Sequence, residues 1–253
     1  HSFPTRRSSD LQQSIEAYQN AKRVAQNESN TALALINNGD ADEQQITTET
    51  DRVNQQTTNL TQAINGLTVN KEPLETAKTA LQNNIDQVPS TDGMTQQSVA
   101  NYNQKLQIAK NEINTINNVL ANNPDVNAIK TNKAEAERIS NDLTQAKNNL
   151  QVDTQPLEKI KRQLQDEIDQ GTNTDGMTQD SVDNYNDSLS AAIIEKGKVN
   201  KLLKRNPTVE QVKESVANAQ QVIQDLQNAR TSLVPNKTQL QEAKNRLENS
   251  INQ

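Results

Sequence analysis

The stretch Asp92-Gly-Met-Thr-Gln-Gln-Ser-Val-Ala-Asn-Tyr102 returns 83 residues later as Asp175-Gly-Met-Thr-Gln-Asp-Ser-Val-Asp-Asn-Tyr185. The same offset relates Asn123-Pro124 to Asn206-Pro207. A match of this length at one offset indicates a tandem array, and the fold of an array is set by its repeated unit.

Repeated positions give the unit its register. The only tyrosines, Tyr18, Tyr102 and Tyr185, share one position, and the first interval is 84 residues because the turn near 38–40 carries one extra residue. Three further positions hold the same aliphatic residue in successive copies: Leu74, Leu157 and Leu240; Leu81, Leu164 and Leu247; Ile85, Ile168 and Ile251. We expect these positions to form the core.

Hydrophobic residues within each unit recur at the three- and four-residue spacing of an amphipathic α-helix. The most regular run, from Val99 to Leu120, alternates these spacings without interruption. The pattern predicts helices over 12–37, 42–66, 74–88, 99–120, 126–150, 157–168, 182–203, 209–233 and 240–251.

Local signals mark where these helices begin. Thr95 is placed to cap the helix that follows it, with Met94 and Val99 packed as a hydrophobic staple. Pro124 is expected at the first position of the next long helix. The first arrangement is expected again at Met177, Thr178 and Val182.

Each complete unit is therefore a short helix followed by two long ones, and short connections favour an antiparallel three-helix bundle. The third helix ends at the pole opposite the start of the first, so successive units continue lengthwise. The predicted fold class is all-α: tandem antiparallel three-helix bundles stacked end to end into an elongated rod. A helix of about 26 residues is about 40 Å long, which is the expected length of one unit.

The repeat divides the chain into a partial two-helix module at 12–68, complete three-helix modules at 69–151 and 152–234, and the first helix of a truncated module at 235–253. Residues 1–11 break the register and resemble a translated sequencing adapter, so we interpret them as non-native and leave them out of the fold. The alternative is a divergent native start. This segment holds the only histidine, His1, and the only phenylalanine, Phe3.

Composition limits the possible partners. The net charge of −6 disfavours nucleic acid and anionic lipid surfaces as partners. No apolar run approaches the roughly 18 residues of a membrane span, so direct membrane insertion is not expected. The chain has no cysteine, which excludes a disulfide framework and a thiolate metal site.

The sequence contains no catalytic constellation. Outside residues 1–11 there is neither histidine nor cysteine, so a Ser-His or Cys-His nucleophile cannot be assembled. We therefore expect no enzyme activity, no catalytic residues, no cofactor and no metal site. Asp92-Gly93 and Asp175-Gly176 lack the spaced acidic ligands of a calcium loop and are interpreted as turns.

Two features could contact a ligand. The repeated tyrosine is expected to fill the helical seam with its hydroxyl at the rim, and the alternative is an aromatic contact for a sugar or peptide. A basic run could bind an acidic glycan such as hyaluronate, although a solvated helix face is the simpler interpretation. That run consists of Lys196, Lys198, Lys201, Lys204 and Arg205.

The order of motifs resembles the FIVAR module found in giant staphylococcal-type extracellular matrix-binding proteins. The matching residues are Thr95, Ser98, Tyr102, Leu106, Asn123, Pro124, Val126, Ile129, Leu143, Ala146 and Leu150, with their copies from Thr178 to Leu233. The resemblance covers 12–253. It implies a cell-wall-associated surface protein built of helical modules without catalytic residues, binding host matrix such as fibronectin, or glycans. No ligand contact can be transferred to a particular residue, so the ligand-binding residues are unknown.

We therefore expect a non-catalytic segment of an extracellular, cell-wall-associated adhesin or stalk that is a monomeric rod. It would bind a fibronectin-like protein or a glycan weakly through many copies. The alternatives are a structural spacer without a ligand and an intracellular coiled-coil scaffold that self-associates.

Overall fold

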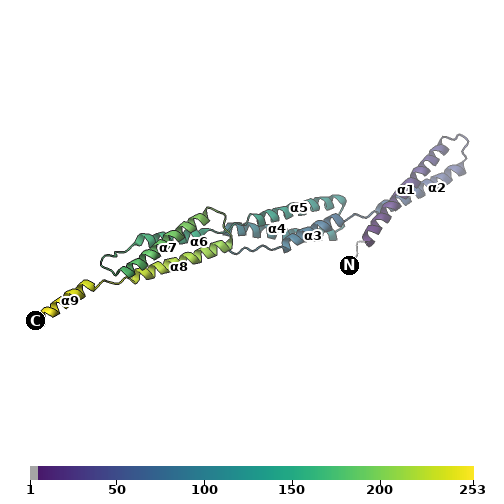
Figure 1. Ribbon diagram of the computed structural model, residues 1–253. Helices are drawn as coiled ribbons and strands as arrows, with labels where there is room; N and C mark the ends of the chain where they lie inside the picture. The colour runs from purple at the N-terminus through teal and green to yellow at the C-terminus, as the bar shows by residue number, and fades with distance from the viewer. Residues whose placement is uncertain (1–4) are drawn as a thin grey trace. The chain divides into compact units, whose positions relative to one another are not determined.

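The computed structural model describes the backbone of residues 5–253 and the side chains from residue 10 onward, and this part of the chain is all-helical (Figure 1). The all-α prediction is confirmed. The helices are α1 (Thr5–Ile36), α2 (Glu43–Asn65), α3 (Glu72–Asp86), α4 (Gln96–Ala121), α5 (Val126–Asn148), α6 (Gln155–Gln170), α7 (Gln179–Leu203), α8 (Val209–Thr231) and α9 (Thr238–Ile251).

Apart from the start of α1, the helix boundaries lie within about three residues of the predicted ones. Helix α3 ends at Asp86, so the expectation that Val88 belongs to its apolar face is wrong, and Val88 is 71% exposed. Helix α1 begins at Thr5 rather than at Gln12, so it extends into the segment interpreted as non-native; His1 and Phe3 lie outside the described residues. The prediction that Pro124 starts α5 is wrong, because Val126 does. The cap is Asp125, whose carboxylate accepts a 2.7 Å hydrogen bond from the Ala128 amide.

The two predicted threonine caps differ. Thr95 Oγ1 accepts the Ser98 amide at 3.3 Å, as expected for a capping residue. Thr178 accepts no such bond, although its hydroxyl donates to Ser181 Oγ at 2.9 Å just as the Thr95 hydroxyl donates to Ser98 Oγ at 2.8 Å. The predicted repetition of the cap is therefore wrong in the second copy.

The helices fall into two compact units, each of which takes part of α4 and α5. One unit comprises residues 1–87 and 105–144, and the other comprises residues 88–104 and 145–253. In the second unit α6, α7 and α8 pack on one another as three neighbouring helices (Figure 1). This is the packing expected of a complete module.

The core of the α6–α8 bundle is built from the repeated aliphatic positions. Leu157 and Leu164 of α6 are fully buried, together with Val199 of α7 and Leu226 of α8. Small residues such as Ala192 and Ala219 occupy the core positions between them. Because few apolar residues are present, nearly every member of the repeated set has to be buried for the bundle to close.

A polar contact also joins the first and third helices of this bundle. Glu167 on α6 accepts hydrogen bonds from the Arg230 guanidinium at 2.9 Å and from the Gln227 amide at 2.6 Å, both on α8. Burial tends to raise the pKa of Glu167, but these two hydrogen bonds outweigh it and the pKa is lowered. The carboxylate therefore stays ionised and holds α6 on α8.

In the first unit, α1 packs on α2, and α3 lies against α5. The Asn84 side chain on α3 donates to the Ser140 carbonyl at 2.9 Å and to Thr144 Oγ1 at 3.0 Å on α5. Lys71, just before α3, donates to the Leu120 carbonyl at 3.0 Å, near the end of α4. These bonds satisfy backbone and side-chain groups between helices far apart in sequence.

Two apolar surfaces stay uncovered in the described residues. Ile46 on α2 is 52% exposed, whereas its copy Val212 on α8 is 6% exposed. Leu240 on α9 is 73% exposed, whereas its copy Leu157 is fully buried. The α1–α2 pair thus has the core face of a module without a short first helix, and α9 has the face of a first helix without its two partners.

Replacement of Leu157 with alanine should lower the free energy of unfolding of the α6–α8 bundle by about 2–5 kcal/mol, because the cavity forms at a fully buried site. Urea unfolding followed by circular dichroism measures this. Leu240→Ala at the exposed copy is the matched control, with an expected change within about 0.5 kcal/mol. Equal losses in the two variants would contradict the assignment of the core.

Backbone amides of α1 and α2 should exchange with solvent faster than those of α7 and α8, since local stability follows the apolar burial around a helix. Hydrogen exchange followed by mass spectrometry compares the equivalent segments directly. Protection of α2 equal to that of α8 would show that the two-helix pair needs no third helix.

Candidate functional site

The repeated tyrosines are core residues in the two later copies. Tyr102 is 2% exposed and Tyr185 is 4% exposed, while Tyr18 is half-buried. The hydroxyl of Tyr102 is buried and forms no hydrogen bond, so the expectation that it reaches the rim is wrong. Burial accordingly raises the pKa of Tyr102. These rings present no aromatic surface to a sugar or peptide.

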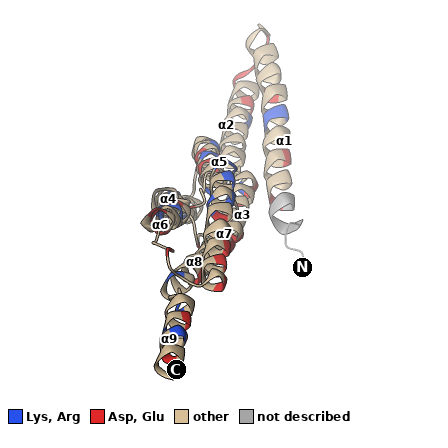
Figure 2. Ribbon diagram, turned by 60° about the vertical axis from the view of Figure 1, so that its left-hand side comes forward, with Lys and Arg blue, Asp and Glu red and all other residues tan. Residues whose placement is uncertain are grey.

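The basic run on α7 is divided among different environments. Lys196 donates to the side-chain oxygen of Gln165 on α6, and Lys198 lies 3.8 Å from the carboxylate of Glu195. Lys201, Lys204 and Arg205 are exposed at the end of the helix, where positive charge complements the helix dipole. Figure 2 shows acidic and basic residues scattered along the helices among a majority of uncharged ones.

Hydrogen bonds to the backbone and to one side chain hold the Asp92–Gly93 turn in place. Gly93 and Gly176 adopt left-handed φ values of 73° and 72°, which glycine tolerates without strain. Asp92 accepts a 2.8 Å hydrogen bond from the ammonium of Lys213. This bond lowers the pKa of Asp92 and raises that of Lys213. Across the described residues no group of three or more potential ligands converges on one point.

A repeated serine accepts a hydrogen bond from the segment that leaves each module. The sequence alone did not indicate this role. Ser98 Oγ accepts the Gln151 amide and Ser181 Oγ accepts the Val234 amide, each at 3.1 Å. In the first copy the Thr68 amide lies 3.4 Å from Ser14 Oγ. The signature serine therefore positions the connection to the next module.

A second repeated residue was also missed. Glu28, Glu112 and Glu195 occupy one position of the repeat, on the first long helix of each copy. Glu112 and Glu195 are each 8% exposed, and one carboxylate oxygen of Glu112 is buried without a hydrogen bond. Burial, followed by the nearby Glu135, raises the pKa of Glu112, while Arg138 opposes the shift. The recurrence of glutamate at this one position of the repeat was the only sign of its burial in the sequence.

Glu112 lines an open groove of about 700 Å³ between α4 and α5, together with Lys130, Glu135 and Arg138. Arg138 donates to both oxygens of Glu135, at 2.6 and 2.9 Å, and to Asp142 at 2.9 Å. Arg138 thus bonds to Glu135 and Asp142, while one carboxylate oxygen of Glu112 stays buried without a hydrogen bond. The raised pKa of Glu112 means that this groove can take up a proton more readily than an exposed carboxylate does.

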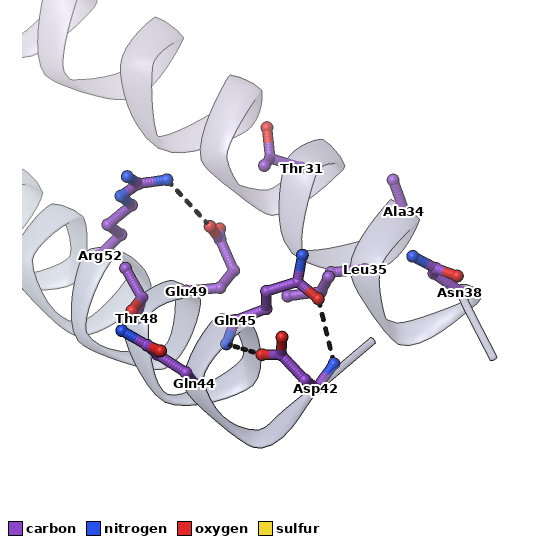
Figure 3. Close-up of a pocket in the computed structure, with 10 residues that line it drawn as sticks. All are labelled: Thr31, Ala34, Leu35, Asn38, Asp42, Gln44, Gln45, Thr48, Glu49 and Arg52. Carbon is purple, nitrogen blue, oxygen red and sulfur yellow. Dashed lines mark hydrogen bonds and ion pairs between the residues drawn. The ribbon is translucent and has the colours of Figure 1, made fainter. Parts of the chain in front are cut away.

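One concave surface of the α1–α2 pair lies beside the turn between these helices (Figure 3). Its volume is about 580 Å³, and Asp42 and Gln45 form a capping box beside it. Arg52 lies 3.8 Å from the carboxylate of Glu49. Figure 3 marks both interactions with dashed lines. A second, more apolar hollow of about 380 Å³ is lined by Ala32, Ile36, Ile46 and Val53. These are copies of core positions, so this hollow is an uncovered part of a bundle.

Replacement of Glu112 with glutamine should increase stability near neutral pH and reduce the pH dependence of unfolding. A raised pKa means that the folded state holds the proton more tightly, so stability falls as pH rises from the ordinary value of 4.5 through the folded pKa. Urea unfolding between pH 4 and pH 8 measures this dependence.

Glu135→Gln is the control of opposite sign. Its hydrogen bond from Arg138 lowers its pKa, so its stabilisation is present above the ordinary value of 4.5 and is lost as pH falls through the folded pKa. Identical pH profiles for the two variants would contradict the separate roles of these carboxylates.

The geometry thus defines a repeated helical domain whose conserved spacing serves the core and the connections between copies. The family model of the FIVAR domain matches residues 5–68, 77–151 and 160–227. The chain therefore belongs to the FIVAR domain family. The family is non-enzymatic, and this chain is accordingly not an enzyme.

Several staphylococcal proteins are identical to this chain at about half of the aligned residues. Over 242 residues the chain is 50% identical to the extracellular matrix-binding protein EbhB of Staphylococcus aureus strain Newman and to the extracellular matrix-binding protein ebh of strain NCTC 8325. It is 49% identical to EbhB of strain N315. These alignments cover 96% of this chain but only 3%, 2% and 6% of those proteins.

No solved structure shows a significant match to the chain. None of the described helices combines the length and hydropathy needed to cross a membrane.

Proposed function

We propose that this chain is a segment of a bacterial cell-surface protein that extends from the cell wall and binds host extracellular matrix through many copies of one module. The observation that carries this proposal is the occurrence of three FIVAR domains in a chain half identical to proteins named for matrix binding. The partner would be a fibronectin-like protein or a glycan.

The modules we propose are 12–68, 69–151, 152–234 and the start of a further one at 235–253. Their continuation lengthwise into a monomeric rod follows from an odd number of antiparallel helices per module, which places entry and exit at opposite poles. Fastening of the exit segment by Ser98 and Ser181 supports this arrangement, because it fixes where each connection leaves its module.

The matrix contact would be weak in each copy. The repeated aromatic residues are buried, and the groove beside Glu112 is open and polar, so neither offers the enclosed apolar pocket of a tight ligand site. Linked copies bind with an avidity about 10²–10⁴ times that of one site where geometry permits simultaneous contact. Repetition would therefore supply the affinity that a single module lacks.

A tandem fusion of two copies of this chain should dissociate from immobilised fibronectin much more slowly than the chain itself, because rebinding becomes intramolecular. Surface plasmon resonance at physiological and high salt measures both proteins, and an unrelated helical protein of similar length and charge serves as the control. A glycan array tests the carbohydrate alternative with the same pair.

The second candidate function is a spacer without a ligand, which the burial of Tyr102 and Tyr185 favours. Its expected outcome is a surface signal equal to that of the unrelated helical control for both the chain and its fusion. An intracellular scaffold that self-associates would instead show concentration-dependent mass in sedimentation.

Small-angle X-ray scattering should give a radius of gyration well above the value of about 18 Å expected for a compact domain of this length. The reason is that about 40 Å is added by each module laid lengthwise. A value close to that of the compact domain would reject the rod while leaving matrix binding open.

A further inference from the structure

The Asp92–Gly93 turn touches a helix that begins far away in the sequence. A Cβ atom placed on Gly93 would lie 2.5 Å from Val209 Cγ1, which is closer than real Cβ contacts, and 3.1 Å from its Cγ2, which is tight. One helical turn further along α8, Lys213 forms its 2.8 Å ion pair with Asp92. All four residues belong to the same compact unit.

The same turn is also bound from its other side by the segment that leaves its own module. The Asp153 amide donates to the Gly93 carbonyl at 2.8 Å, and the Thr95 amide donates to the Gln151 carbonyl at 2.7 Å. In the next copy the Asn236 amide donates to the Gly176 carbonyl at 2.8 Å, and the Thr178 amide donates to the Val234 carbonyl at 2.7 Å. The hydrogen bonds between the turn and the segment that leaves its module are therefore present in both copies.

The contact between the turn and a helix is present in the described residues only for the Asp92–Gly93 turn, which is followed by the third helix of the next module. Gly176 repeats the φ value of Gly93, but nothing lies within 4 Å of a Cβ placed there, and no third helix follows α9 in the sequence. Conversely, Val126 on α5 is the copy of Val209 and is 54% exposed, whereas Val209 is half-buried. Lys130, the copy of Lys213, is exposed.

We infer that the Asp-Gly turn of each module is a docking site for the start of the third helix of the following module, which is recognised by its Val-x-x-x-Lys sequence. The partner of Asp175–Gly176 is thus another copy of this repeat, and Val126 with Lys130 is the surface that receives the turn of a preceding copy. Glycine is required in the turn because the valine packs directly on its Cα.

The two contacts have different roles. The Asp92–Lys213 pair is exposed, and exposed ion pairs add little stability, so it chiefly selects the partner surface. Because Val209 packs on Gly93, there is no room for a Cβ atom at position 93, and only glycine fits there. Together they fix the orientation of α8 on the turn, where the default for linked domains is relative motion.

Double electron–electron resonance on the full chain tests this docking site. The chain has no cysteine, so spin labels at Gln97→Cys on α4 and Asn218→Cys on α8, both exposed, are the only ones. We expect a single narrow distance distribution, which Gly93→Ala should broaden about twofold because the docked helix is released.

Gly176→Ala is the matched control, since it imposes the same left-handed strain at a turn with no neighbour, and it should leave the distribution unchanged. Equal broadening by both substitutions, or a broad distribution in the unsubstituted chain, would overturn the inference.

A charge reversal keeps the test independent of the glycine. Lys213→Glu should broaden the distribution, and Lys213→Glu combined with Asp92→Lys should restore it; Lys130→Glu, at the copy without a docked turn, should have no effect. Failure of the double variant to restore the narrow distribution would exclude the ion pair from recognition. This docking site is independent of the proposed function, because the measured distance distributions do not depend on whether the chain binds matrix.

Discussion

The whole structure depends on the burial of a small number of repeated aliphatic side chains. Only 31% of the residues are hydrophobic, so no helix has apolar surface to spare. A single helix such as α9 leaves Leu240 and Leu247 mostly in water, and two helices such as α1 and α2 leave Ile46 half exposed. In the α6–α8 bundle the equivalent residues are buried, which supports the three-helix unit that we propose for the repeat.

The residues that form the core differ from those that form the connections between modules. Polar residues that seem interchangeable along the helices have fixed tasks at the module ends: Ser98 and Ser181 hold the exit segment, and Gly93 gives room to Val209.

Much of this architecture could be predicted from the sequence, because helix type and core position are both encoded in spacing. The repeated leucines and tyrosines identified the buried face, and the 83-residue offset identified the copies. Helix starts were less predictable: Asp125 caps α5 although Pro124 offered the stronger local signal, and Thr178 accepts no hydrogen bond from a free amide. The Asp125 cap is a side-chain-to-backbone hydrogen bond of the kind that decides where a helix starts.

The functional features were harder to foresee, and for a physical reason. Glu112 is buried because the turn of α4 places it between helices, and its charge gave no sign of this without the comparison to Glu28 and Glu195. The contact of Gly93 with Val209 joins residues from different copies, so spacing within one unit cannot reveal it. Ligand contacts were not predictable at all, since the repeated aromatic residues face the core.

Methyl–methyl nuclear Overhauser effects in the full chain test the central claim most directly. If the repeated aliphatic residues close on one another, Leu164 on α6, Val199 on α7 and Leu226 on α8 should show mutual cross-peaks and slowly exchanging amides around them. Sharp methyl signals without cross-peaks between these helices would contradict the three-helix core.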